Sequence, residues 1–95
     1  MKKKSFYVVA YDISDTKRRA KVVKVLQRVG IRVNLSVFEC MVNDTQFNIL
    51  CHELEKIVIP KEDQINIYYL CTNCFSKIKY IPKDVRKIPE TIVVI

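Results

Sequence analysis

Apolar residues in the first third of the chain are spaced first as a strand and then as a helix. The run Phe6–Ala10 is aromatic and β-branched throughout, which is typical of a buried strand. Asp15 then stands where a helix N-cap is expected, and Gly30 stands just past the last periodic residue. The apolar positions between them share one face: Val22, Val23, Val25, Leu26 and Val29. This pattern predicts an amphipathic helix of roughly four turns.

The segment from Arg32 to Val42 alternates between two sets of side chains, which predicts strand. It is either one long strand or a tight hairpin near Asn34-Leu35-Ser36. No Gly or Pro marks a turn within it, so local signals leave both possibilities open.

A second helix is predicted next, capped by Asn43 or Asp44 and ending before Pro60. Its buried stripe is expected to consist of Phe47, Leu50, Cys51, Leu54, Ile57 and Val58. The segment Gln64–Leu70 alternates again and predicts another strand, with Ile65, Ile67 and Tyr69 on one side. A loop containing Cys71 and Cys74 follows.

The order of these elements favours an α+β sandwich, with both helices on one face of an antiparallel sheet. If the middle segment is a hairpin, the order becomes βαββαβ, the ferredoxin-like pattern. We expect residues 1–95 to form a single domain, with 82–95 as a C-terminal arm. A second copy would then cover the helix-free face of the sheet. It would also pair with the strand-like ending of the chain, which one small domain would struggle to cover: Thr91, Ile92, Val93, Val94 and Ile95.

Composition narrows the class of protein. Apolar residues make up 49% of the 95 residues, which argues against disorder, and 17 Lys and Arg against 10 Asp and Glu give a net charge of +7. A basic balance in so short a chain favours a polyanionic partner such as nucleic acid. The sequence contains no apolar run long enough to cross a membrane and no convincing signal peptide, so we expect a cytoplasmic protein without a membrane partner.

The junction after the first strand carries the candidate chemistry. Asp12 ends an apolar strand, where a carboxylate is costly unless it has a cation or hydrogen-bonding partner. An acid that can hold a hard metal ion, set beside cations that can hold phosphate, indicates metal-assisted phosphodiester chemistry. An ordinary Asx-turn is the alternative for Asp12.

Basic residues follow Asp12 on the outer side of the first helix. These residues either contact phosphate or are simply exposed to solvent. We favour phosphate contact slightly, because we expect no acid to neutralise them. The candidate nucleic-acid-binding residues are Ser14, Lys17, Arg18, Arg19, Lys21, Lys24 and Arg28. Asp15 is expected to cap the helix and not to bind a metal.

The spacing Cys71-Thr72-Asn73-Cys74 is that of half a zinc site, but no second Cys or His pair is well placed to complete it. Cys40 and Cys51 fall on expected apolar faces and are interpreted as small hydrophobic residues.

Several of these segments together resemble one known family, the small CRISPR adaptation nucleases of the CRISPR-associated protein two family. The resemblance covers nearly the whole chain in order and spacing. The matching segments are Tyr11-Asp12-Ile13-Ser14-Asp15, Lys17-Arg18-Arg19, Val22, Gly30, Val33, Ser36-Val37-Phe38-Glu39, Glu53-Leu54-Glu55, Ile67-Tyr68, Leu70-Cys71 and Cys74.

The resemblance implies a ferredoxin-like fold and a homodimer formed through the sheets, with residues Thr91 to Ile95 at the interface. Phe38 is expected either at this interface or as a buried structural residue. It also implies a magnesium-dependent endonuclease that cuts single-stranded RNA or double-stranded DNA, with Asp12 as the catalytic and metal-binding residue. Similar proteins join a CRISPR integrase during spacer acquisition. Two alternatives remain: a non-catalytic DNA-binding adaptor that bridges integrase dimers, and a related toxin-type endoribonuclease.

Overall fold

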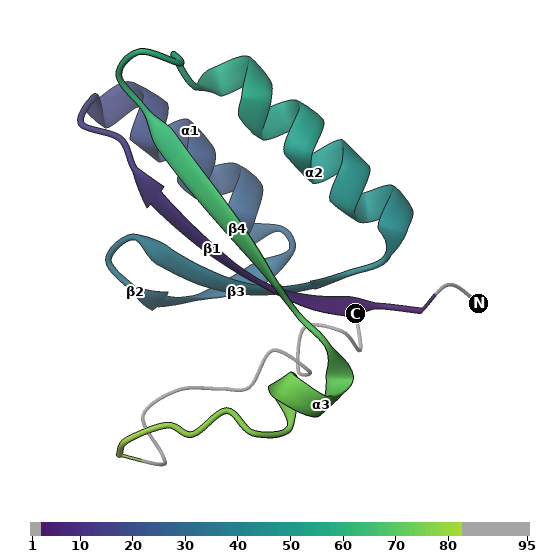
Figure 1. The fold of residues 1–95 in the computed structure, drawn as a ribbon. Coiled ribbons are helices and arrows are strands. Elements are labelled where there is room, and N and C mark those ends of the chain that lie inside the picture. The colour runs from purple at the N-terminus through teal and green to yellow at the C-terminus, as the bar shows by residue number, and fades with distance from the viewer. Residues whose placement is uncertain (1–2, 83–95) are drawn as a thin grey trace.

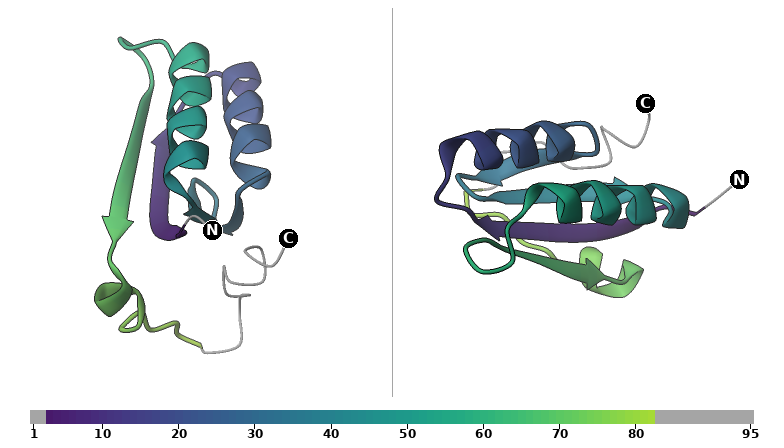
Figure 2. Two further views of the ribbon diagram at one scale, coloured as in Figure 1. Left: turned by 90° about the vertical axis from the view of Figure 1, so that its right-hand side faces the viewer. Right: turned by 90° about the horizontal axis from the view of Figure 1, so that it is seen from above.

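The computed structural model describes residues 3–82. Its elements follow the order β1 (Ser5–Asp12), α1 (Thr16–Gln27), β2 (Gly30–Asn34), β3 (Val37–Val42), α2 (Asp44–Ile57), β4 (Gln64–Leu70) and α3 (Thr72–Phe75). The strands form one antiparallel sheet in the order β2-β3-β1-β4. Both long helices lie side by side on the same face of this sheet (Figures 1 and 2). This confirms the α+β, ferredoxin-like βαββαβ arrangement.

The middle segment is a hairpin, which resolves the alternative that the sequence leaves open. β2 and β3 pair antiparallel, with an irregularity between Arg32 and Asn34. The backbone N–H of Leu35 donates to Asn34 Oδ1 at 2.7 Å, and the Leu35 carbonyl oxygen accepts from the Tyr11 hydroxyl at 2.9 Å, so side chains hold the turn without Gly or Pro.

Both long helices begin at the predicted caps. Asp15 accepts a hydrogen bond from the backbone N–H of Arg18 at 2.9 Å, and Asn43 forms a reciprocal capping box with Gln46. The prediction that Gly30 ends the first helix is wrong. Gly30 is the first residue of β2, and a Cβ there would lie 2.5 Å from both Cys40 Sγ and the Glu39 carbonyl oxygen, so close packing requires the glycine.

The core lies between the helices and the sheet, as the periodicity predicts. Val22 and Leu26 of α1 and Leu50 and Leu54 of α2 are buried against Val9, Tyr11, Phe38 and Cys40 of the sheet. The register places Val9 opposite Phe38 in β3 and Ile67 in β4, so these side chains share the helix-covered face. No helix within residues 3–82 has the length and apolar character needed to span a bilayer.

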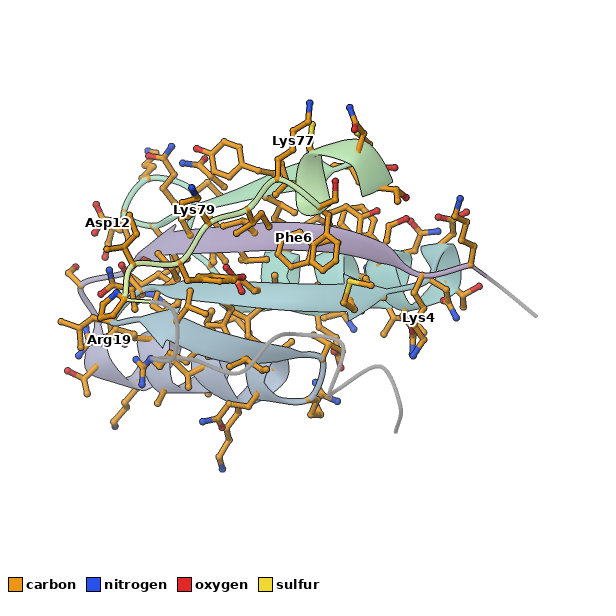
Figure 3. The ribbon with its side chains drawn as sticks, turned by 90° about the horizontal axis from the view of Figure 1, so that it is seen from below. Lys4, Phe6, Asp12, Arg19, Lys77 and Lys79 are labelled. Atoms are coloured by element: carbon orange, nitrogen blue, oxygen red, sulfur yellow. The ribbon has the colours of Figure 1, made fainter. Side chains whose placement is uncertain are left out.

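The chain itself covers part of the opposite face. The residues after β4, expected to be a loop, form the short helix α3 and then cross the helix-free face of the sheet (Figure 3). We call residues 72–82 the strap. The Phe75 ring lies 4.8 Å from the Phe6 ring between centroids, and the Tyr80 hydroxyl donates to Glu39 Oε1 at 2.8 Å. The remainder of the predicted arm, including Thr91 to Ile95, lies outside the described residues.

Candidate functional site

Asp12 is the last residue of β1 and its side chain is exposed. Its neighbours Tyr11 and Ile13 are buried, at 5% and 4% exposure, so the backbone on either side of the carboxylate is fixed by the core. Strand alternation places Asp12 on the same face as Phe6, which is the face that the helices leave open. Asp12 and Arg19 lie at the same end of the sheet (Figure 3). The exposed position leaves the carboxylate accessible to a ligand.

A groove of about 560 Å³ opens beside this carboxylate. Its lining residues come from the end of β1, the start of α1 and the β2–β3 hairpin: Tyr11, Asp12, Ile13, Arg19, Arg32, Leu35 and Ser36. Among these residues Asp12 is the only acid, whereas two are arginines. The groove therefore combines one carboxylate with a net positive lining.

Hydrogen bonds hold the two arginines of the groove in place. Arg19 donates from one terminal nitrogen to the carbonyl oxygens of Ile13 and Ser14, at 2.9 and 3.2 Å, and so ties α1 to the loop that follows Asp12. Arg32 donates to the Leu35 carbonyl oxygen at 2.8 Å and to the Tyr11 hydroxyl at 3.1 Å. Each guanidinium has five N–H donors, so both retain donors for an anion.

Sequence reasoning missed Arg32. It reaches the groove only because β2 and β3 fold back as a hairpin, and the sequence does not decide whether that hairpin forms. The alternation of Arg32 to Val42 would have been the available signal, since a turn at Leu35 returns Arg32 toward the end of β1.

Arg18 has a structural partner. Its guanidinium donates to both carboxylate oxygens of Asp63, at 2.7 and 3.1 Å, and to Glu62 at 3.1 Å. The Asp63 side chain has no exposed area, and the hydrogen bond from Arg18 is the main reason why its pKa lies below the ordinary value of 3.8. The backbone N–H of Ile59 also donates to this carboxylate. Arg18 thus joins the start of α1 to the loop before β4.

The basic stripe of α1 is partly neutralised, which corrects the expectation that no acid accompanies it. Arg28 forms an ion pair with Glu53 of α2 at 2.8 Å. Within residues 3–82, Lys17, Lys21 and Lys24 are exposed and form no ion pair. These three lysines form the free cationic surface of α1, which we call the lysine stripe. Ser14 is also exposed, in the loop between β1 and α1.

Phe38 does not occupy the predicted interface. Its exposure is 0%, and it lies on the helix-covered face among the core residues, so it has no surface left for direct contact with a partner subunit. The buried alternative for Phe38 is therefore confirmed and the interface alternative is wrong, because the register of β3 against β1 places Phe38 opposite Val9, inside the protomer.

The described residues do not form a complete metal site by themselves. No group of three or more His, Cys, Asp or Glu side chains within residues 3–82 could hold an ion. Mg²⁺ is commonly held by one or two carboxylates together with waters and substrate phosphates, so Asp12 fits as a partial ligand and not as a cage.

Both the sequence and the fold of the chain are similar to those of known proteins. The family model for CRISPR associated protein Cas2 matches residues 5–78. The chain is 45% identical over 67 residues to CRISPR-associated endoribonuclease Cas2 3 of Chloroflexus aurantiacus, covering 70% of this chain and 72% of that protein.

Solved structures share the same arrangement. Cas2 of Streptococcus pyogenes matches with a TM-score of 0.70 at 33% identity, over 79% of this chain and 96% of that one. A chain of a structure described as a partial Cas6-RT-Cas1--Cas2 complex matches with a TM-score of 0.72 over 90% of this chain and 94% of that one, and its 24% identity shows the fold alone.

Proposed function

Because the chain belongs to the CRISPR-associated Cas2 family, we propose that it is a CRISPR adaptation protein and an endonuclease that hydrolyses phosphodiester bonds at Asp12. Its substrate would be single-stranded RNA, double-stranded DNA or both; the relative from Chloroflexus is named an endoribonuclease. The observation that carries the proposal is the exposed Asp12 carboxylate in a groove that also contains Arg19 and Arg32.

The arginines of the groove have a direct role in this proposal. A sugar-phosphate backbone entering the groove would approach two guanidinium groups whose remaining donors suit phosphate oxygens. Because one nitrogen of each is already bonded to backbone carbonyls, the side chains need little reordering to bind an anion. Arg19 and Arg32 would thus position the phosphate beside Asp12 and offset its negative charge.

Magnesium completes the proposed chemistry. Asp12 would contribute a carboxylate ligand, and substrate phosphates or the Asp12 of a second subunit would supply others. When bound, the ion would stabilise charge on the phosphate and lower the pKa of a water molecule. A homodimer is part of this proposal, since a twofold axis is the simplest way to bring two carboxylates to one ion.

Cleavage of labelled RNA and duplex DNA by purified protein, with and without Mg²⁺, tests this proposal. Asp12→Asn should abolish cleavage while leaving the fold and the binding of substrate intact. The matched control is Asp15→Asn, which removes a carboxylate three residues away but keeps an equally good N-cap. Undiminished cleavage by Asp12→Asn would exclude the carboxylate from the mechanism.

The lysine stripe favours a second function, that of a DNA-holding adaptor for a CRISPR integrase. Its three lysines are exposed and unpaired within the described residues, so they are available for phosphate contacts that position a duplex without reading its bases. Spacer acquisition in cells separates the two functions. An adaptor predicts normal acquisition with Asp12→Asn and loss with neutralised lysines, whereas an essential nuclease predicts loss with Asp12→Asn.

A further inference from the structure

The cysteines of this chain fall into two classes of environment. Cys40 is fully buried, and burial raises the pKa of its thiol to about 12. Burial likewise raises the pKa of the half-buried Cys51 thiol. Cys71 and Cys74 are instead both exposed, at the point where β4 passes into α3. Cys71 and Cys74 are therefore the thiols that reagents in solution reach most easily.

Cys71 and Cys74 belong to the same turn, and the sulfur of one contacts the backbone of the other. Cys71 caps α3, and its Sγ accepts a hydrogen bond from the backbone N–H of Cys74 at 3.5 Å. A hydrogen bond between the Phe75 N–H and the Cys71 carbonyl oxygen, at 2.8 Å, closes the same turn. The Cys71 sulfur thus lies against the backbone of Cys74 within a single turn.

These contacts make the two thiols chemically unequal. The hydrogen bond from the Cys74 backbone N–H is the main reason why the pKa of the Cys71 thiol lies below its ordinary value, whereas the neighbouring Cys71 side chain raises the pKa of Cys74. Thiolates are the nucleophiles of disulfide exchange, so the attacking and resolving roles fall to different residues.

We propose that Cys71 and Cys74 form a reversible dithiol–disulfide site that reacts with low-molecular-weight disulfides such as glutathione disulfide. The Cys71 thiolate attacks one sulfur of glutathione disulfide, which forms a mixed disulfide and releases one glutathione thiolate. The Cys74 thiol then loses its proton to solvent and attacks the Cys71 sulfur, which releases the second glutathione. Two protein thiols are oxidised and one small disulfide is reduced to two thiols.

The position of the pair favours this chemistry over a structural metal site. A structural zinc site needs four ligands, and no group of three or more metal-binding side chains lies within residues 3–82. The internal disulfide needs only the two residues already in contact. It would also fix the turn that leads from β4 to Phe75, whose ring packs on Phe6.

Incubation of the reduced full chain in glutathione redox buffers, followed by intact-mass measurement and peptide mapping, tests the proposal. The wild type should lose two hydrogens and gain no glutathione, with Cys71 and Cys74 in one disulfide-linked peptide. Cys74→Ser should accumulate one glutathione on Cys71, because the resolving thiol is absent while a hydroxyl donor remains. Alkylation in the wild type should modify Cys71 at a lower pH than Cys51.

Cys51→Ser is the matched control and should behave as the wild type, since Cys51 is not part of the pair. Circular dichroism establishes that each variant is folded. Three results would overturn the proposal: stable glutathione adducts on the wild type, disulfides that form between molecules, or no adduct on Cys71 in folded Cys74→Ser.

Discussion

Neutralising the lysine stripe is the most direct test of how this protein holds nucleic acid. Lys17, Lys21 and Lys24 are exposed on one side of α1 and form no ion pair within residues 3–82. Changing all three to Gln lowers the net charge from +7 to +4, the difference being the three lysines removed. Because no carboxylate within the described residues loses an ion-pair partner, the fold should be unaffected.

The size of the effect follows from counterion release. Each phosphate neutralised on a duplex contributes about 0.9 to the slope of log affinity against log salt concentration. If each lysine contacts one phosphate, the variant should have a slope per protomer that is shallower by about 2.7. If the two affinities converge at about 1 M salt, that difference corresponds to an affinity loss of about 170-fold at about 0.15 M salt, shrinking to about 6-fold at about 0.5 M.

Fluorescence anisotropy with a labelled duplex, measured over a range of salt concentrations, gives both the affinity and its dependence on salt. The control variant replaces Lys56, Lys61 and Lys77, which are exposed elsewhere on the molecule, with Gln. It has the same net charge as the test variant, so a general effect of charge would appear in both.

Equal slopes for the two variants would refute the argument, because they would show that total charge and not the face of α1 determines binding. A loss of affinity that is the same at every salt concentration would also refute it, since contacts to phosphate must weaken as salt rises.

Three further predictions concern the site, the core and the loop before β4. Asp12→Asn should lower the rate of magnesium-dependent cleavage by at least about 100-fold in single-turnover assays, and a rate near that of the wild type would contradict the proposed site. Phe38→Ala removes a fully buried ring and should lower the free energy of unfolding, measured in urea, by about 3–5 kcal/mol. Leu35 is 82% exposed, so Leu35→Ala should change the free energy of unfolding by less than about 0.5 kcal/mol. Similar losses in the two variants would disprove the assignment of Phe38 to the core. Because Arg18 lowers the pKa of Asp63, the contribution of this ion pair to stability should be complete above pH 3.8 and disappear as the pH falls through the lower pKa of the folded state. The urea midpoint of Asp63→Asn should therefore fall less in acid than that of the wild type. Parallel curves of midpoint against pH would exclude this linkage.

The long helices and central strands were predictable because their signals are local. Asp15 and Asn43 cap helices through residues only three positions away, and the apolar stripes follow the helical period. The hairpin was not predictable, because its turn uses the Asn34 side chain in place of the usual glycine. The end of the first helix was misplaced for a related reason. Gly30 is required because its backbone packs closely against β3, and the residues next to Gly30 in the sequence do not reveal this contact.

The candidate site divides in the same way. Asp12 could be identified from the sequence because a carboxylate after an apolar run is conspicuous. The partner of Arg18 could not, because Asp63 is 45 residues away and meets it only after α2 folds against α1. The sequence could not decide between a buried and an interface role for Phe38, since strand alternation gives two faces but does not say which one the helices cover.

The strap has a consequence for any variant shortened at the C-terminus. A chain that stops at Leu70 would uncover Phe6, now only 2% exposed, and would deprive the Glu39 carboxylate of its Tyr80 partner. Such a truncation would expose apolar side chains on the helix-free face of the sheet, so it should aggregate more readily than the intact chain. It would also alter the footprint offered to a second subunit, since a protomer docking on this side would otherwise meet Phe75 and Tyr80 before the strands beneath them.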